Sequence, residues 1–571
     1  MFFKTTLFVL FYYLILISTF GYGLLFSNFI KIRNQVFSFS ISGILGVIFL
    51  TFLSYTTNFF FAHNYVHNIV VHIFGLLFFF IFLKKNFNKP FFYKQLILLS
   101  IFFLLSLFLS KNNEDFPYYH LAFTLNLVES NTIIGIGNFN PAYRTASSLF
   151  YYNSLTYLPY IKYYLFHSSG VIILTFASFF FINNFFFKKT YNKNNFINIL
   201  CALIFTFVVL TFSRIAEYGT DRAGQIVVYI LIIIILKIIN KKEIDLDKSK
   251  VAILLILYVI TVKAYFIVYS LFLLIVLIKF KATEILKLIK KNYSFFFCTL
   301  FFTLVYFLSN LLNSGCLVYP LVFTCFENLS WTASLENIAQ NNQWFELWAK
   351  AGATPNYIVN DKENYIKFLN WFPNWISNYF FTKGSDFILI ILSISLTFFL
   401  FFKNLSERNV KEISKYKYVY FLLILLFIIW FNKHPDLRYG GYAVVSLLFF
   451  IPISIFLSKF NIRNNKIKKF YTYIILFALI IFNLKNILRI HSEFNRTDRY
   501  QFKDFPFFYV EKVEFTQYEI NEENIVNFPI NNNCWAVLFP CVEEHQGLEA
   551  EDFFIFKKFF RKKSIMNPVI K

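Results

Sequence analysis

Residues 94–120 read KQLILLSIFFLLSLFLSKNNEDFPYYH, and this stretch decides how the rest of the chain is interpreted. Its apolar part, Leu96–Leu109, is predicted to cross a membrane as a helix, as one of many runs that approach the roughly 20 apolar residues needed to span a bilayer. Glu114 and Asp115 stand side by side where the chain leaves that helix, and aromatic residues and His120 follow. Two adjacent carboxylates at a membrane boundary suggest a functional site.

Composition predicts a multi-pass membrane protein whose main partner is the lipid bilayer. Of the 571 residues, 58% are hydrophobic and 15% are charged, and the mean hydropathy is +0.57. A soluble domain is about 45–50% apolar and about 25% charged. The net charge of +23 lies in short loops between apolar runs, as the positive-inside rule expects. We therefore expect no nucleic-acid partner.

The predicted fold is all-α, because the apolar runs lack the period-two alternation of barrel strands. Lysine-rich links should be cytoplasmic, which places the lysine-poor loops on the external face. This orientation requires Val251–Lys279 to be two short helices broken near Lys263; the alternative is one long tilted helix. With the break, about 14 helices cross the membrane and both termini lie outside. The runs fall near residues 5–28, 36–57, 69–83, 95–110, 168–187, 195–214, 225–239, 251–279, 293–312, 385–402, 418–432, 441–457 and 470–486.

Four segments follow from this pattern. Residues 1–90 are expected to be appended transmembrane helices, and 91–385 a core with long external loops. Residues 386–486 hold the last helices, and 487–571 form a polar tail that we predict to be a small external domain.

Cysteine placement agrees with this orientation. Cys316 and Cys325 flank one external loop, and Cys534 and Cys541 lie in the tail. In an oxidising compartment they can form two local disulfides; free thiols are the alternative. The six cysteines include no CxxC pair, so no zinc site is expected.

The first external loop, Lys111–His167, holds the leading candidates. Apolar positions at helical spacing predict that Phe116–Glu129 lies on the membrane surface. Glu114 and Asp115 precede this helix, where anionic groups are favoured. They are candidates for a general base or for ligands of a divalent metal ion; the alternative is a helix cap with a solvated acid.

The other external loops add further candidates. Asp221 and Arg222 lie in the next loop, where Asp221 could cap a helix or share a metal ion with Glu114. Lys263 is a candidate phosphate ligand or a lysine that snorkels to the interface. Arg438 suits a bidentate phosphate contact, unless it forms a surface pair with Asp436.

Five of the seven tryptophans lie in the loop Gly315–Gly384. Trp371 and Trp375 precede an apolar run and are candidates for an interfacial aromatic belt. The segment Gln343–Lys350 is a candidate wall of a substrate site.

The order of these features resembles the GT-C superfamily of membrane glycosyltransferases. Residues 95–385 match its seven-helix core if Val251–Lys279 is broken. Glu114 and Asp115 match its acidic first-loop motif, and Asp221 matches the second acid of some members. The Glu-Asp order departs from the commoner Asp-Asp, Asp-Glu or Asp-x-Asp, so either carboxylate could act.

The chain is also similar to an uncharacterised bacterial family of large polytopic membrane proteins. The shared features are Asp115–His120, the aspartate at Asp221, Trp371–Trp375 and Pro435–Tyr439. No reaction can be carried over from that family.

The GT-C resemblance implies an inverting glycosyltransferase on the external face of a bacterial inner membrane. It would transfer a sugar from a polyprenyl-phosphate donor to a cell-envelope glycan or lipid acceptor. Asp115 or Glu114 would be the base, and Asp221 would help to hold Mg²⁺ or Mn²⁺ if an ion is needed. The donor phosphate and substrate would be bound by Lys263, Arg438, Arg222, His120 and Tyr119. The alternative is a transporter or polysaccharide-export component that uses the same charges as gating pairs.

Overall fold

Apolar helices form most of the chain in the computed structural model. The structure describes residues 2–85, 90–109, 112–186, 196–217, 220–240, 245–278, 292–353, 359–402, 416–460, 464–495, 508–530, 533–537, 540–543 and 545–561. Most of the lysine-rich links that the sequence predicts to be cytoplasmic lie outside these residues. They include 187–195, 279–291 and 403–415.

Eight helical segments of the described residues are long and apolar enough to cross a membrane, which indicates a membrane protein. Shorter apolar helices lie between them, at Tyr93–Phe108, Phe196–Thr211, Ala264–Ile278 and Gly441–Leu457. The eight are Phe3–Phe29, Gln35–Asn58, Tyr65–Phe82, Tyr163–Phe185, Thr220–Asn240, Tyr293–Ser314, Phe372–Phe402 and Asn465–Phe494.

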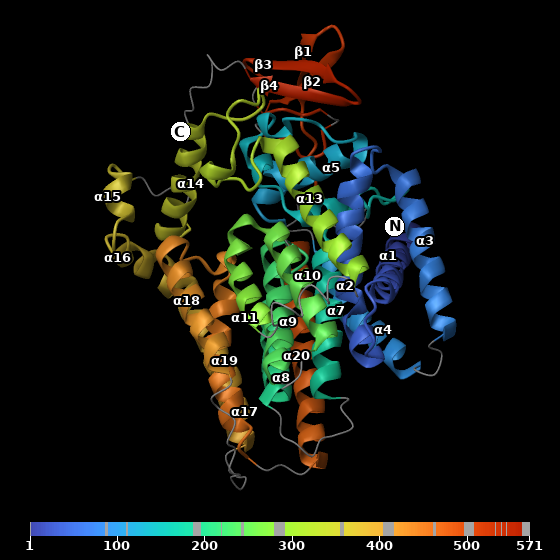
Figure 1. Ribbon diagram of the computed structural model, residues 1–571, viewed down its shortest axis with the longest axis vertical. Coiled ribbons are helices and arrows are strands. Elements are labelled where there is room, and N and C mark those ends of the chain that lie inside the picture. Colours follow the sequence, from blue (N-terminus) through green and yellow to red (C-terminus); the bar gives the residue numbers. More distant parts are fainter. Residues whose placement is uncertain are drawn as a thin grey trace.

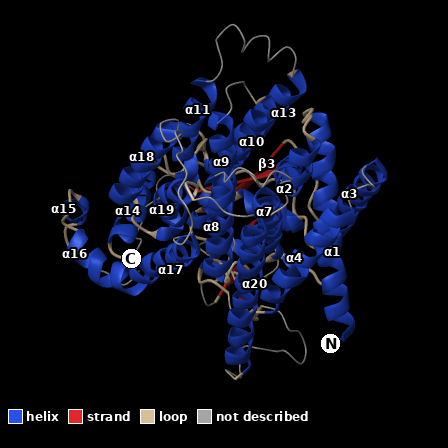
Figure 2. Cartoon of the chain, turned by 90° about the horizontal axis from the view of Figure 1, so that it is seen from below, coloured by secondary structure: helices blue, strands red, loops and turns tan. Residues whose placement is uncertain are grey.

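The helices form three groups, which Figures 1 and 2 show from two directions. One side holds α1 (Phe2–Phe29), α2 (Gln35–Asn58), α3 (Tyr65–Lys85) and α4 (Pro90–Leu104). The other side holds α17 (Ser385–Phe402), α18 (Lys417–Lys433) and α19 (Gly441–Leu457). Between them lie α7 (Ser168–Phe185), α8 (Phe196–Thr211), α9 (Thr220–Asn240), α10 (Leu246–Val262) and α20 (Asn464–Phe494).

Glycines set the spacing of the first two helices. A Cβ on Gly23 would lie 1.7 Å from the Ser42 carbonyl oxygen, and one on Gly46 would lie 1.8 Å from that of Thr19. The backbones of α1 and α2 therefore touch. Such close approach favours helix association in lipid, where packing replaces the hydrophobic effect.

The C-terminal segment covers one end of the bundle with strands. Two antiparallel pairs form, β1 (Phe515–Asn521) with β2 (Asn524–Pro529) and β3 (Leu548–Phe553) with β4 (Phe556–Arg561). We call this the strand end (red, top of Figure 1). The Ile134 amide donates to the Lys557 carbonyl oxygen at 2.9 Å, and the Phe559 amide donates to that of Ile134 at 2.8 Å. The tail therefore packs directly on the segment that follows α4.

That segment contains short helices that are buried instead of lying on a surface. After α4 and η1 (Leu105–Phe108) come the π-helical turn η2 (Phe116–His120) and α5 (Leu121–Glu129). Every residue from Leu121 to Val128 is buried, partly because Phe508 and α6 (Ser148–Ser154) pack there. The surface-helix prediction for Phe116–Glu129 is therefore wrong: protein covers its apolar face. Short turns η3 (Ile136–Asn138), η4 (Pro141–Thr145) and η5 (Tyr163–Leu165) complete the segment.

The helix in the second half of the core breaks at Lys263. Lys263 has extended backbone angles, φ −153° and ψ 128°, directly after α10. The 3₁₀ helix η6 (Ala264–Leu271) and α11 (Phe272–Ile278) follow, and α11 packs back against α10. The chain thus turns near the strand end, as the two-helix interpretation of Val251–Lys279 predicts.

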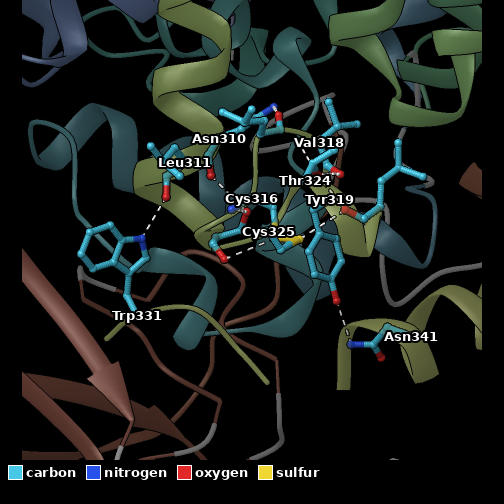
Figure 3. Close-up of a disulfide and its surroundings, with 12 residues drawn as sticks. Asn310, Leu311, Cys316, Val318, Tyr319, Thr324, Cys325, Trp331 and Asn341 are labelled. Carbon is cyan, nitrogen blue, oxygen red and sulfur yellow. Dashed lines mark hydrogen bonds between the residues drawn. A yellow bond between two sulfur atoms is a disulfide. The ribbon is translucent and has the colours of Figure 1, made fainter. Parts of the chain in front are cut away.

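The long connection after α13 (Tyr293–Ser314) is ordered by a disulfide and by tryptophans. Cys316 and Cys325 are bonded, with Cα atoms 3.9 Å apart, beside η7 (Val322–Thr324). Figure 3 shows Asn341 of α14 (Leu335–Lys350) donating to the Tyr319 hydroxyl below that disulfide, at 2.8 Å. The connection ends with α15 (Lys362–Ile366), α16 (Phe372–Trp375) and the π-helical η8 (Ile376–Gly384). The second disulfide joins Cys534 to Cys541, with Cα atoms 6.0 Å apart.

Candidate active site

Four charged side chains from four distant parts of the chain form one linked row at the strand end. The Arg438 guanidinium lies 2.8 Å from Asp115 Oδ2 and 3.0 Å from Asp221 Oδ2. The Lys263 Nζ lies 2.6 Å from Asp221 Oδ1. We call Asp115, Arg438, Asp221 and Lys263 the charge row. It alternates in sign and sums to zero net charge.

Asp115 is held at the start of a π-helical turn. Its backbone amide donates to the Asn113 side chain at 3.3 Å. Asn112 accepts from His167 at 2.8 Å and donates to the Tyr509 carbonyl oxygen at 2.7 Å. The tail and the start of α7 therefore fix the chain just before Asp115. Single π-helical turns occur frequently at functional sites.

Asp221 occupies the first turn of α9, where the helix dipole favours a carboxylate. One turn further on, Gln225 donates to the carbonyl oxygens of Leu437 and Arg438, at 3.1 and 3.2 Å. Its own oxygen accepts from the Ala443 amide at 3.1 Å. Helix α9 therefore supplies one ligand of Arg438 and also anchors the loop that carries it.

The loop around η10 (Leu437–Tyr439) aims Arg438 at the two acids. Asp436 accepts from the Arg438 amide at 2.9 Å and from the Tyr379 hydroxyl at 2.7 Å. Trp375 donates to the Pro435 carbonyl oxygen at 2.7 Å, and Gly440 turns the chain with φ 99°. The predicted surface pair of Asp436 with the Arg438 guanidinium does not form, because Asp436 accepts from the Arg438 backbone amide instead. The guanidinium reaches Asp115 and Asp221.

Aromatic rings cover both cations. The Lys263 Nζ lies 4.1 Å from the centre of the Tyr439 ring, and the Arg438 guanidinium lies 5.6 Å from that of Trp348. Burial alone would lower the pKa of Arg438, but the carboxylates of Asp221 and Asp115 outweigh it and raise that pKa well above its ordinary value. Arg438 is therefore permanently charged beside two carboxylates.

The sequence matches one family model along most of its length. That model, Domain of unknown function (DUF8201), covers residues 6–445. The chain belongs to the DUF8201 family. Neither the curated proteins nor the solved structures compared with the chain contain a match. All four members of the charge row lie within the DUF8201 match, whereas the strands of the tail lie beyond it.

The donor set does not fit a divalent metal ion in this DUF8201 protein. Asp221 directs one oxygen at Lys263 and the other at Arg438, so a metal ion would have to displace a bound cation. Glu114 is exposed and makes no ion pair with any described residue. Within those residues, no group of three or more His, Cys, Asp and Glu side chains is arranged to hold a metal ion.

The remaining candidate residues surround the charge row without joining it. Arg222 donates to the Arg214 carbonyl oxygen at 2.8 Å. The Tyr119 ring packs against the His120 ring, with ring centres 3.9 Å apart. Burial, and then the charge of Arg438, lower the pKa of His120 well below its ordinary value, so its imidazole is neutral. A neutral buried ring is poorly suited to bind a phosphate.

His120 instead lines a small cavity next to η2 and the start of α9. Its volume is about 20 Å³, and Asn153, His167 and Thr220 also line it. A cavity of this size with polar walls holds about one water molecule. It is too small for a sugar.

Three residues that position the charge row carry no charge: Tyr379, Gln225 and Trp348. The chain has 37 tyrosines, so Tyr379 cannot be singled out by type. The sequence feature that sets Tyr379 apart is its spacing: Trp375 and Tyr379 are four residues apart and share one helical face.

Proposed function

We propose that this protein is a membrane glycosyltransferase that moves a sugar from a polyprenyl-phosphate donor to a cell-envelope acceptor. The observation that carries the proposal is the charge row, which joins two carboxylates to two cations at one end of the bundle. Phosphate recognition requires the cations, and activation of an acceptor hydroxyl requires a carboxylate. This set of groups suits glycosyl transfer from a phosphate better than it suits metal chemistry.

The row also suggests the sequence of events. The donor phosphate takes the place of Asp115 beside Arg438, and Lys263 contacts the same phosphate. Asp115 is thereby released to accept the proton of the acceptor hydroxyl. That oxygen attacks the anomeric carbon as the bond to the phosphate oxygen breaks, and the electron pair stays on the phosphate. Arg438 and Lys263 stabilise that charge, while Asp221 keeps both cations in position.

We further propose that the strand end faces the outside of a bacterial inner membrane, with about 14 helices crossing it. The end of α3 and the start of α20 lie away from the strands (Figure 1), next to lysine-rich sequence. Both disulfides join cysteines of external loops in this orientation. In the GT-C scheme, residues 95–385 would form the core, and the turn at Lys263 supplies the extra pair of short helices.

Substitution of the acids tests the proposal. We expect Asp115→Asn to reduce sugar transfer from polyprenyl-phosphate donors by about 10²–10⁴-fold, the typical contribution of a general base. Glu114→Gln is the matched control, because Glu114 is adjacent but exposed, and it should retain most of the activity. Purified protein in lipid nanodiscs would be assayed with radiolabelled donor. Transfer at the normal rate by both variants would rule out the proposed mechanism.

One observation favours the alternative of a transporter or export component. The charges of the row are paired with each other, as in a closed gate, and the cavity beside them holds about one water molecule. A gate predicts that Asp115→Asn increases flux of lipid-linked sugar across proteoliposomes, whereas a transferase predicts unchanged flux and loss of transfer.

A further inference from the structure

The tail contributes a carboxylate to the surroundings of the first acidic loop. Cys541 is bonded to Cys534, and the Val542 amide donates to the Asn527 carbonyl oxygen at 2.9 Å. The next residue, Glu543, donates its amide to the Phe139 carbonyl oxygen at 3.2 Å. A disulfide-closed turn thus places Glu543 on the segment that follows α5.

The Glu543 carboxyl lies among neutral polar groups. Asn140, next in the chain to Phe139, donates to the Tyr118 carbonyl oxygen at 3.1 Å. The Glu543 Oε1 is buried without a hydrogen-bond partner in the described part of the chain. Glu543 also forms no ion pair there. An unused buried oxygen is costly unless a ligand or water satisfies it.

Tyr118 connects this carboxyl to the charge row. It lies three residues after Asp115, on η2, and is 37% exposed. Burial, with smaller contributions from Glu543 and Asp115, raises the pKa of Tyr118 to about 12, so its hydroxyl stays protonated. Its ring contacts that of Tyr119, with centres 5.7 Å apart. Its carbonyl oxygen accepts from Asn140, the residue after the Phe139 that Glu543 contacts, so the exposed Tyr118 ring lies on the segment that joins Asp115 to the surroundings of Glu543.

We propose that Glu543 and Tyr118 form the acceptor subsite, in which Glu543 binds a hydroxyl of a glycan. The proposal rests on the function proposed above. A protonated carboxyl donates one hydrogen bond and accepts another, as a sugar hydroxyl does. The ring supplies the flat apolar contact that small-molecule sites combine with few polar groups. No cation of the described residues pairs with Glu543, so the donor phosphate belongs at Arg438 and Lys263.

The charge state of Glu543 gives the subsite a pH dependence. Burial raises its pKa to about 8, against a weaker opposing effect of Asn140. The titratable groups facing it are Tyr118 and Tyr143, both with raised pKa values and therefore neutral. Two arginines that contact the same segment of the chain, Arg144 and Arg561, donate to the carbonyl oxygens of Gly137 and Asn138. Glu543 is thus protonated below about pH 8 and loses its proton above it.

Kinetics separate acceptor binding from the chemistry. Glu543→Ala should raise the acceptor KM about tenfold and leave donor KM and donor hydrolysis unchanged. Glu543→Gln keeps a donor and an acceptor at all pH values, so its acceptor KM should stay flat above pH 8, where that of the wild type rises. Glu522→Ala is the control, an exposed acid of the same tail. An equal change in donor KM, or no change in either variant, would overturn the subsite.

A labelling experiment reads out the subsite without transfer. Dicyclohexylcarbodiimide modifies protonated carboxyls that are shielded from water, so it should label Glu543 of the full-length protein at pH 7. Maltose, lactose or chitobiose should protect Glu543, and polyprenyl phosphate should not. Protection without any sugar transfer would retain a glycan site but reject the proposed function. Normal transfer with no protection, and normal kinetics for Glu543→Ala, would reject the subsite alone.

Discussion

Arg438 links the two acids of the site. Among the described residues, only its guanidinium contacts both Asp115 of the first external loop and Asp221 of α9. Lysine carries the same charge but has no planar fork, so it does not reproduce the two fixed contacts of the guanidinium. At 8% exposure, Asp221 has little water to replace the lost contact. Replacing Arg438 by a neutral residue, or by a cation without the planar guanidinium, should therefore weaken the site.

We expect Arg438→Lys to fold but to raise the donor KM about tenfold, equivalent to about 1.4 kcal/mol of binding free energy. Donor titrations in nanodiscs would measure it, together with the melting temperature. Lys433→Ala is the control: its Nζ lies 3.1 Å from Glu346 but is 61% exposed. Such a pair contributes about 0–1 kcal/mol. An unchanged donor KM in Arg438→Lys would remove Arg438 from the phosphate site.

Among the elements, η8 and η10 form the contact that presents Arg438. The Tyr379 hydroxyl donates to Asp436 at 2.7 Å and accepts from the Leu437 amide at 2.8 Å. Both partners are buried. Removing that hydroxyl leaves each without this partner, which costs about 1–3 kcal/mol per buried group.

Tyr379→Phe should therefore lower the melting temperature and reduce transfer severalfold, because the Arg438 loop loses its anchor. Thermal unfolding and initial rates would be measured on the same preparation. Tyr418→Phe changes a 61% exposed ring on α18 and should alter neither. A lower melting temperature with full activity would show that Gln225 and Trp375 suffice to hold the loop.

The bounds of single helices are predicted well from the sequence where apolar runs have polar ends. The run 441–457 coincides with α19, and 36–57 differs by one residue at each end from α2 (Gln35–Asn58). Helix α9 starts at Thr220, whereas the apolar run predicts a start near residue 225. The prediction is late because Asp221 and Arg222, in the first turn of the helix, are charged residues typical of a loop. Hydropathy also cannot show whether the apolar face of Leu121–Val128 contacts lipid or other parts of the protein.

The charged residues of the site were identifiable because charge is rare in this chain, at 15% of residues. Asp115, Asp221, Lys263 and Arg438 interrupt apolar sequence and so attract notice. Of their neutral supports, Trp348 lies within Gln343–Lys350, the predicted wall of a substrate site, and its ring covers Arg438. Tyr379 and Gln225 have no such contrast with their neighbours in the sequence. Glu543 lies in a polar tail, where an acid is ordinary, and only tertiary contacts relate it to Asp115.

In the whole molecule, two disulfides brace segments that lead to different parts of the proposed site. Cys316–Cys325 packs with Ile338 of α14, the helix whose Trp348 covers Arg438. Cys534–Cys541 closes the turn that leads to Glu543. Each closes a loop of fewer than a dozen residues, so each stabilises its segment by about 2–3 kcal/mol through the unfolded state.

We therefore expect the two pairs to affect different substrates when replaced by serine. The Cys316→Ser/Cys325→Ser variant should raise the donor KM severalfold, because α14 loosens over Arg438. The Cys534→Ser/Cys541→Ser variant should raise the acceptor KM and leave the donor KM unchanged, because only Glu543 loses its support. Each variant is the control for the other, in the same nanodisc assay. If both raised the same KM, the tail would not serve a separate acceptor side, since mere destabilisation would change both substrates alike.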